Sequence, residues 1–451
     1  MKANAHAITP SLVCIVALVV LQAITVLAIQ HAAIAYAWMI PAQLHLGYYI
    51  NPSRWGRMNL VILGSNLFEV LALYGLFRFL PSDRVPNLIK VFTAGGVATM
   101  LAVSLSVRLT GFDAILYIYF AKVANLATAY QTPPSLAPVP SDFAVLHPLI
   151  VKLKFASPYG PLWEIFDRAL LAGTHSVGQA IFTLKVANAA ALVAVFATLL
   201  LLRLPFRHAA LFFLNPALYD NYIVQAHNDL FAILPILVAL LVARRGAWSV
   251  AALLASLAGL VKLSLVVIAL ATIASIGNIR ARLGSAALIV VVLVLGSLLI
   301  GGTPYLHALV FVGNAQTHSG GSHVQRDVRF ALQLTLVAVS VVALVDAVLW
   351  KRLMRSATWT FPGFSGLLHM WYFPWTIPFA IRFRTTAAAL AVSLPLFEVV
   401  TTQRAANLIR VGPATATLAV LAALGVWELA RTKARGEAPS ADWPGDAVRL
   451  W

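Results

Sequence analysis

Uncharged apolar stretches long enough to cross a lipid bilayer recur along this 451-residue chain. A membrane-spanning helix needs about 20 consecutive apolar residues. The stretches and their polar flanks predict spans near residues 11–33, 58–79, 87–107, 176–202, 208–224, 229–243, 247–277, 284–302, 330–350, 357–381, 385–402 and 412–430. A transmembrane β-barrel would instead show alternating segments of about 10 residues. The pattern therefore predicts an all-α polytopic transmembrane helical bundle of about 11–14 spans, some of them broken or re-entrant.

The composition excludes the soluble classes of protein. Hydrophobic residues make up 61% of the chain and charged residues only 10%, whereas an ordinary soluble domain is about 25% charged. A soluble core cannot bury that much apolar surface, so a soluble enzyme, a disordered protein and a fibrous protein are excluded. The net charge of +17 resides mainly in short segments between apolar stretches, without a basic stripe that carries interleaved aromatic residues. We therefore expect no nucleic-acid partner.

The positions of Lys and Arg predict how the chain lies in the membrane. With the N-terminus in the cytoplasm, most basic residues fall in inner loops or in the tail, as the positive-inside rule requires. Residues 1–33 are then a retained span, because this apolar stretch is longer than the core of a usual signal peptide. We expect residues 1–451 to form one integral membrane domain, with a long extracytoplasmic loop at 109–175, a second at 303–329 and a cytoplasmic tail at 431–451.

Two apolar stretches and the long loop differ from simple spans and connections. The stretches 247–277 and 357–381 carry polar or proline residues in the middle, which predicts pairs of short or broken helices. Broken helices at membrane depth are tolerated only where they line a cavity. Within the long loop, Ala114–Ala129 and Leu162–Ala172 are amphipathic enough to form helices on the membrane surface. Long loops with helices of their own are more often functional than idle.

Few carboxylates can meet a substrate outside the membrane. Those predicted on the outer side are Asp113, Asp142, Glu164, Asp167, Asp220, Asp229 and Asp327. Asp113 directly follows the third predicted span, at the border of membrane and water. A partly desolvated carboxylate binds a proton more readily than one in water, which suits a general base. The alternative is an interfacial aspartate that caps the helix that follows it.

The segment 215–229 concentrates amide, acid, imidazole and phenol groups between two apolar stretches. Its residues His227, Asn228 and Asp229 can form a hydrogen-bonded cluster that faces a cavity. They can equally form a buried network that holds two helix ends. His227 and Asp229 offer only two ligands to a metal ion, which is a weak basis for a metal site.

Several positive charges lie further along the chain. Lys262 interrupts an apolar stretch, where a lysine must pair, line water or extend to the interface. A lysine is also a good point-charge partner for a phosphate. The predicted loop 303–329 contains Arg326 and Arg329 and is basic. It is either a ligand-binding loop or an ordinary solvated one.

Aromatic residues interrupt the stretch 357–381 at Trp371, Tyr372 and Trp375, around a proline. One interpretation is an aromatic belt at the membrane interface. The other is a wall of rings that stacks on a sugar or a lipid.

Five of these features occur in an order that resembles the membrane-embedded glycosyltransferases of the GT-C class. In particular, they are similar to polyprenol-phosphate-mannose-dependent mannosyltransferases of bacterial cell-envelope synthesis. In chain order they are Asp113, Ser-Pro-Tyr-Gly-Pro at 157–161, Asn215-Pro216 with Gln-Ala-His-Asn-Asp at 225–229, Lys262, and Trp-Tyr-x-x-Trp at 371–375. The resemblance covers roughly residues 105–380. It departs at Ala226, where the family usually has glycine, and in placing Asp113 after a third span rather than the first.

The resemblance implies transfer of one sugar, with mannose the first candidate, from a polyprenyl-phosphate donor to a glycolipid or glycan acceptor. Transfer would take place on the extracytoplasmic side of a bacterial inner or plasma membrane, among membrane lipids, with inversion at the anomeric carbon. The aspartate base of the family maps onto Asp113. We expect no cofactor and no obligatory metal, because the donor carries a single phosphate.

The remaining site residues follow from the chemistry of such a donor. A phosphate leaving group needs stabilisation of its charge, for which the candidate donors are Lys262, His227, Arg326 and Arg329. The candidate substrate-binding residues are Tyr117, Tyr159, Asn228, Asp229, Trp371, Tyr372 and Trp375.

Two other functions fit some of the same residues. In a transporter or lipid flippase, Lys262 and the segment 225–229 would line the pathway. The lack of a recognisable inverted repeat and the presence of the long loop 109–175 count against this alternative. An acyltransferase or other lipid-modifying enzyme would use His227.

Overall fold

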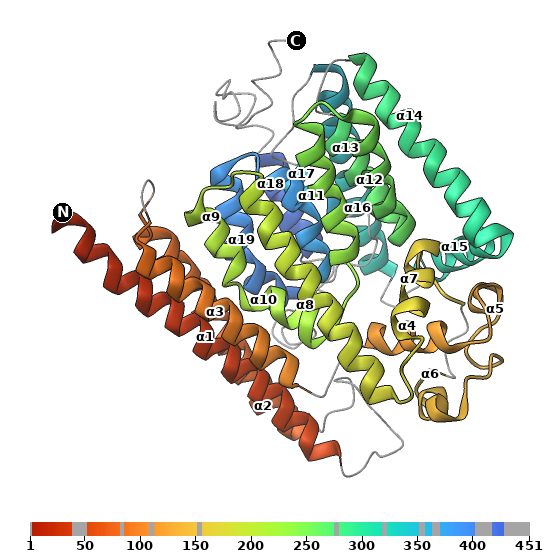
Figure 1. Ribbon diagram of the computed structural model, residues 1–451, viewed down its shortest axis with the longest axis horizontal. Coiled ribbons are helices and arrows are strands. Elements are labelled where there is room, and N and C mark those ends of the chain that lie inside the picture. The colour runs from red at the N-terminus through yellow and green to blue at the C-terminus, as the bar shows by residue number, and fades with distance from the viewer. Residues whose placement is uncertain are drawn as a thin grey trace. The chain divides into compact units, whose positions relative to one another are not determined.

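The computed structural model describes most of the chain. The described residues are 2–37, 52–81, 85–107, 112–150, 156–274, 279–317, 323–350, 357–362, 370–401 and 417–427. Within these ranges every regular element is a helix and none is a strand (Figure 1). The all-α fold class predicted from the apolar stretches is therefore confirmed. The predicted tail at 431–451 lies outside the described residues.

The chain divides into two compact units that interleave along the sequence. The first unit comprises Met1–Val193, Ala210–Leu230 and Gly296–Thr317. The second comprises Ala194–Ala209, Phe231–Leu295 and His318–Trp451. Helix α8 (Val177–Leu201) therefore contributes residues to both units.

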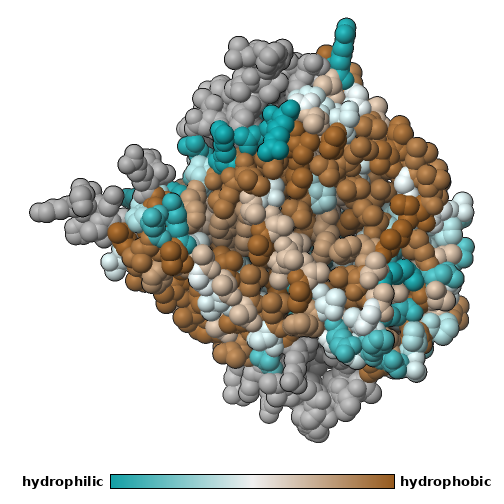
Figure 2. Space-filling model, viewed as in Figure 1, coloured by the Kyte–Doolittle hydropathy of each residue, from teal (hydrophilic) through white to brown (hydrophobic). Residues whose placement is uncertain are grey.

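The first unit begins with three long helices that lie side by side, α1 (Lys2–Ala37), α2 (Pro52–Phe79) and α3 (Asn87–Ser106) (Figure 1). Large apolar side chains such as Leu60, Phe68 and Val91 are more than 60% exposed. Figure 2 shows hydrophobic residues over much of the visible surface of these helices. Soluble proteins rarely expose contiguous apolar surface of this extent, so these faces suit contact with lipid.

Short helices follow α3 in the first unit. They are α4 (Phe112–Lys122), α5 (Leu126–Gln131), the 3-10 helix η1 (Ser141–Leu146), α6 (His147–Ile150) and α7 (Pro161–Leu171). The unit is completed by α10 (Pro216–Tyr219), the π-helix η2 (Asp220–Val224), the π-helix η4 (Ser297–Gly301) and α15 (Gly302–Thr317). Helices α10 and η2 pack against α3, and α15 packs against α5.

The structure corrects the prediction for Ala114–Ala129. This stretch contains two helices, α4 and α5, because the Asn125 side chain accepts a hydrogen bond from the Thr128 amide and starts a new helix. Residues 114–120 of α4 are at most 4% exposed. Apolar residues on every side of a helix favour burial within the protein over a position on a surface. The other predicted helix, Leu162–Ala172, corresponds to α7.

Helices α4 and α7 cap one another at their C-terminal ends. Lys122 in the last turn of α4 donates to the carbonyls of Leu171 and Thr174, at 2.7 and 2.9 Å. Arg168 in the last turn of α7 donates to the carbonyls of Val123 and Asn125, at 2.9 and 3.0 Å. A positive charge at a helix C-terminus satisfies unpaired carbonyls and interacts favourably with the helix dipole. These reciprocal hydrogen bonds hold α4, the helix that carries Asp113, against α7.

The second unit is also helical throughout its described part. Its elements are α11 (Leu230–Ala243), α12 (Trp248–Val261), η3 (Leu263–Leu265), α13 (Val266–Ala274), α14 (Ile279–Gly296), α16 (His323–Trp350), α17 (Ala357–Thr360), η6 (Met370–Thr376), α18 (Ile377–Ala380), α19 (Arg384–Thr401) and a helix over Thr417–Trp427. Helix α9 (Phe206–Phe213) extends from one unit into the other. Lys262 has extended backbone between α12 and η3, and short helices divide 357–381. The prediction of broken helices at both places is confirmed.

Five helices of the described chain are long and apolar enough to cross a membrane. They lie at Ile8–Ala28, Leu60–Phe79, Asn87–Ser106, Val177–Leu201 and Ile279–Val310. Shorter apolar helices lie at Leu230–Ala243, Trp248–Val261, Leu263–Thr272, Phe330–Val342 and Thr417–Trp427. The sequence predicted more spans than these five, because several of the predicted stretches consist of shorter helices in the structure.

Two predicted elements differ from the structure. The stretch 208–224 contains α9, α10 and η2 in place of one span, because Pro216 cannot continue a helix and Asn215 before it is extended. The stretch 303–329, expected as a loop, lies mostly in α15 and the start of α16. Polar and basic side chains occur both in loops and on the exposed side of a helix, so the polarity of 303–329 could not distinguish a loop from a helix.

Candidate active site

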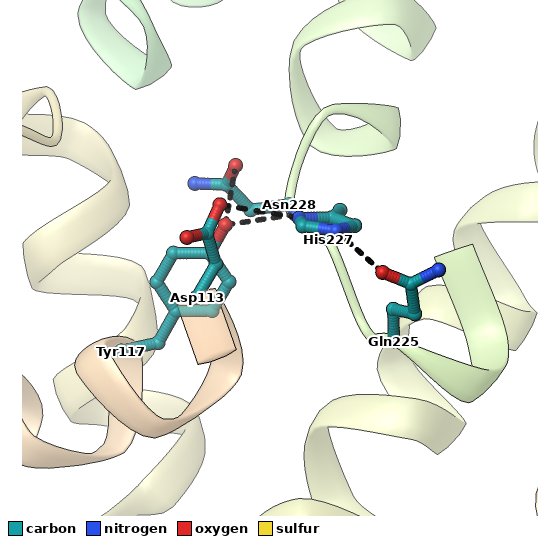
Figure 3. Close-up of polar contacts among 5 residues, drawn as sticks. All are labelled: Asp113, Tyr117, Gln225, His227 and Asn228. Carbon is teal, nitrogen blue, oxygen red and sulfur yellow. Dashed lines mark hydrogen bonds and ion pairs between the residues drawn. The ribbon is translucent and has the colours of Figure 1, made fainter. Parts of the chain in front are cut away.

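The first unit brings Asp113 and His227 into direct contact. An Asp113 carboxylate oxygen, Oδ2, lies 3.2 Å from Nδ1 of His227. Asp113 is in the first turn of α4, and His227 follows the π-helix η2 in the segment 225–229 (Figure 3). The Asp113 side chain is 27% exposed, whereas that of His227 is only 2% exposed. A molecule that reaches this pair therefore meets the carboxylate first.

The second ring nitrogen of His227 faces Gln225. Nε2 of His227 lies 3.3 Å from the Gln225 side-chain oxygen, so the imidazole ring stands between an amide and a carboxylate (Figure 3). Both ring nitrogens therefore have close side-chain neighbours, which sets the orientation of the imidazole ring beside the Asp113 carboxylate.

Tyr117 connects α4 to the same segment. Its hydroxyl donates to the Asn228 side-chain oxygen at 3.1 Å and accepts from the Asn228 amide at 3.4 Å. Burial raises the pKa of Tyr117 well above its usual value, and the charges of Asp113 and Asp229 raise it further. Tyr117 therefore remains a neutral phenol that can donate. Its ring packs edge-on against Tyr159 and Trp163, with centroids 4.7 and 5.0 Å away.

Backbone hydrogen bonds from η2 shape the segment that carries His227. The Gln225 amide donates to the Asp220 carbonyl at 2.9 Å, and the His227 amide donates to the Asn221 carbonyl at 3.2 Å. Between them, Ala226 has a φ of 56° and is fully buried. This left-handed conformation favours glycine, the residue that the resembled family usually has at this position. Ala226 thus adopts the left-handed backbone conformation that a glycine takes up readily.

The structure gathers the predicted site residues into two groups. In the first unit, Asp113, Tyr117, Tyr159, His227, Asn228 and Asp229 come together. In the second unit, the Lys262 ammonium lies 5.0 Å from the Tyr372 ring centroid and 5.4 Å from that of Trp375. These distances are typical of cation–π contacts. The side chains of Arg326, Arg329 and Trp371 lie outside the described residues.

Sequence reasoning missed two members of the first group. Gln225 was part of the Gln-Ala-His-Asn-Asp motif, but nothing in its spacing from His227 predicted a contact. Trp163 lies two residues beyond the Ser-Pro-Tyr-Gly-Pro motif and is fully buried against Tyr117. The only available signals were the position of Gln225 inside one motif and that of Trp163 close to another.

Two buried carboxyl groups lie one helical turn apart on α7. Glu164 accepts a hydrogen bond from the Ser157 hydroxyl, and burial raises the pKa of Glu164 to about 7. Burial also raises the pKa of Asp167 well above its usual value, and the charge of Glu164 adds to this. The positive charges of Arg168 and Lys122 lower the pKa of Asp167 and so oppose part of this rise. Within the described part of the chain, no group of three or more His, Cys, Asp or Glu side chains could hold a metal ion.

Replacing Glu164 with glutamine is expected to stabilise the protein in alkali but not in acid. Because the pKa of Glu164 rises from 4.5 to about 7 on folding, its contribution to stability is complete below pH 4.5. That contribution is lost as the pH rises through 7, and the loss is about 3 kcal/mol. Glu164→Gln should therefore unfold at a higher temperature than the wild type at pH 8 and at a similar one at pH 4.5. Thermal unfolding in nanodiscs at both pH values measures this.

The exposed carboxylate of Asp142 provides the matched control for Glu164. Asp142→Asn should leave the unfolding temperature unchanged at both pH values. Equal unfolding temperatures for Glu164→Gln and the wild type at pH 8 would mean that Glu164 is not a buried acid.

The fold and the site together define a helical protein with segments long and apolar enough to cross a membrane and with a carboxylate–imidazole pair at the start of α4. Residues 117–277 match the model of a family described as alpha-(1->6)-mannopyranosyltransferase, N-terminal domain. The predicted resemblance to GT-C mannosyltransferases is thereby confirmed, and the match supports a glycosyltransferase that transfers mannose. No curated protein and no solved structure matches the chain.

Proposed function

We propose that this protein transfers mannose from a polyprenyl-phosphate donor to a glycolipid or glycan acceptor on the extracytoplasmic face of a bacterial membrane. Asp113 is the general base, and the anomeric carbon is inverted. The observation that carries the proposal is the contact of the partly exposed Asp113 with the buried His227. The family match over residues 117–277 and the apolar helices support it.

The proposed reaction is a direct displacement. Asp113 removes the proton from an acceptor hydroxyl as the hydroxyl oxygen attacks the anomeric carbon. The bond between that carbon and the phosphate oxygen breaks, and polyprenyl phosphate leaves with the bonding electron pair. One displacement inverts the configuration of the sugar. A phosphate leaves readily when its negative charge is stabilised, so no general acid is required.

His227 takes a different role from the one assigned by sequence. It was a candidate phosphate ligand, yet it is 2% exposed, and its two ring nitrogens face Asp113 and Gln225. We therefore assign it to orienting Asp113. Lys262, beside Tyr372 and Trp375, remains a proposed partner of the donor phosphate. Arg326 and Arg329 are proposed for the same role from the sequence.

The choice of donor tests the proposal. Purified protein in nanodiscs is given either polyprenyl-phosphate [¹⁴C]mannose or a nucleotide-diphosphate [¹⁴C]mannose, together with membrane glycolipids as acceptors. We expect labelled product only from the lipid-linked donor, with the opposite anomeric configuration. Transfer from the nucleotide sugar would overturn the donor assignment. Movement of the lipid-linked sugar across proteoliposome membranes without transfer would favour the flippase alternative.

A further inference from the structure

A buried glutamine in the first helix is hydrogen-bonded to the element that precedes the catalytic segment. Nε2 of Gln22 in α1 donates to Asp220 Oδ1 at 2.8 Å and to Ser104 Oγ of α3 at 3.1 Å. Gln22 and Ser104 are fully buried, and Asp220 is 6% exposed. All three residues belong to the first unit.

The environment makes this interaction strong. Gln22 lies within the apolar helix Ile8–Ala28, one of those able to cross a membrane. A polar side chain in such surroundings is unfavourable unless its hydrogen bonds are satisfied inside the protein. A hydrogen bond to a carboxylate is about twice as strong as one between neutral groups. Gln22 and Asp220 therefore hold each other in place across α1 and η2.

Asp220 is the first residue of the π-helix η2, whose end carries the catalytic segment. Its carbonyl accepts from the Gln225 amide, and the Gln225 side chain faces the His227 ring. His227 in turn contacts Asp113. A continuous series of contacts thus leads from α1 to the proposed base. π-helical turns are frequently found at functional sites.

We propose that Gln22 is a positioning residue for the Asp113–His227 pair, acting through Asp220 and the π-helix η2. The proposal rests on the function proposed above. It extends the site to α1, which precedes both the family match at 117–277 and the resemblance at 105–380. The first span thereby has a role in catalysis in addition to anchoring the chain.

Gln22→Met tests this proposal, with Thr25→Val as the matched control. Thr25 lies three residues further along α1, is 1% exposed, and donates to Ser65 of α2 at 3.0 Å. Both variants remove a buried interhelical hydrogen bond, so both should lower the unfolding temperature. Only Gln22→Met should lower kcat, by about 10- to 100-fold with KM unchanged, because it displaces the catalytic pair. Equal kcat values in the two variants would overturn the proposal.

A double variant separates positioning from folding. Gln22→Met leaves the buried Asp220 carboxylate without this partner, which lowers stability. Replacing both residues by apolar ones of similar size is nearly neutral for stability. Gln22→Met/Asp220→Leu should therefore regain the unfolding temperature of the wild type while its kcat stays low. Recovery of kcat together with stability would show a structural role only.

The imidazole ¹⁵N resonances of His227 give a readout that does not depend on turnover. They should shift in Gln22→Met and in the double variant, and should keep their wild-type positions in Thr25→Val. Wild-type protein that transfers no mannose would refute the proposed function, and the resonances would still test the positioning. Active wild type with unshifted resonances in Gln22→Met would refute the positioning alone.

Discussion

Replacing Asp113 with asparagine is expected to lower the turnover number for mannose transfer about 10³-fold. Asparagine keeps the size of the side chain but cannot accept the proton of the acceptor hydroxyl, and general-base catalysis contributes about 10²- to 10⁴-fold. The stability change should be small, because asparagine keeps a side-chain oxygen for the contact with His227 and a charge in the first turn of α4 contributes only about 0.3–1 kcal/mol. Turnover with the lipid-linked donor and thermal unfolding of the same preparation measure both effects.

The exposed Asp142 again supplies the control for this experiment. Asp142→Asn removes one carboxylate from the same region and should transfer mannose at the wild-type rate. An Asp113→Asn variant with nearly full turnover and a slightly lower unfolding temperature would identify Asp113 as a helix cap. The assignment of the base, and with it the proposed displacement, would then be wrong.

Replacing Ala226 with valine is expected to destabilise the protein by at least about 1–3 kcal/mol, the cost of overpacking a buried site, and to abolish transfer. Ala226 has a φ of 56°, a conformation that costs L-residues about 1–2 kcal/mol and is least tolerated by β-branched side chains. The site is fully buried, so two extra methyl groups add an overpacking penalty of about 1–3 kcal/mol. Thermal unfolding and the yield of folded protein test this expectation.

Glycine at the same position provides the contrasting result. Ala226→Gly relieves the backbone strain, which offsets the loss of a buried methyl group, so stability should change by less than about 1 kcal/mol. Ala217 in α10 is buried to a similar extent but is helical. Ala217→Gly should therefore be less stable than Ala226→Gly by about 2 kcal/mol. Equal stabilities would show that the conformation at Ala226 carries no strain.

Several features of this protein could be predicted because they depend on residues close together in the chain. An apolar stretch must form helices in a bilayer, where each backbone group needs a partner in the same segment. Interruptions by Lys262 and by Pro374 correctly predicted breaks in two of these stretches. The order of short motifs was sufficient to indicate the family that residues 117–277 match.

Local sequence patterns did not predict the structure correctly where the same residues fit more than one kind of element. The amphipathic character of Ala114–Ala129 suggested a surface helix, yet residues 114–120 of α4 are buried on every side. The polar stretch 303–329 fitted a loop as well as the helices α15 and α16 that it forms. Burial and helix continuity at these places depend on neighbouring elements, which the local sequence does not specify.

The sequence by itself determined the helical membrane class, the breaks in the helices and the set of chemically capable side chains, because hydrophobicity and helix propensity act over a few turns. Only the tertiary structure decided which of those side chains meet. It placed the His227 ring against Asp113 and Gln225, and it paired Gln22 with Asp220 across 198 positions of the chain. Such pairs form because packing of α1, α3, α4 and η2 buries polar groups that must then satisfy one another.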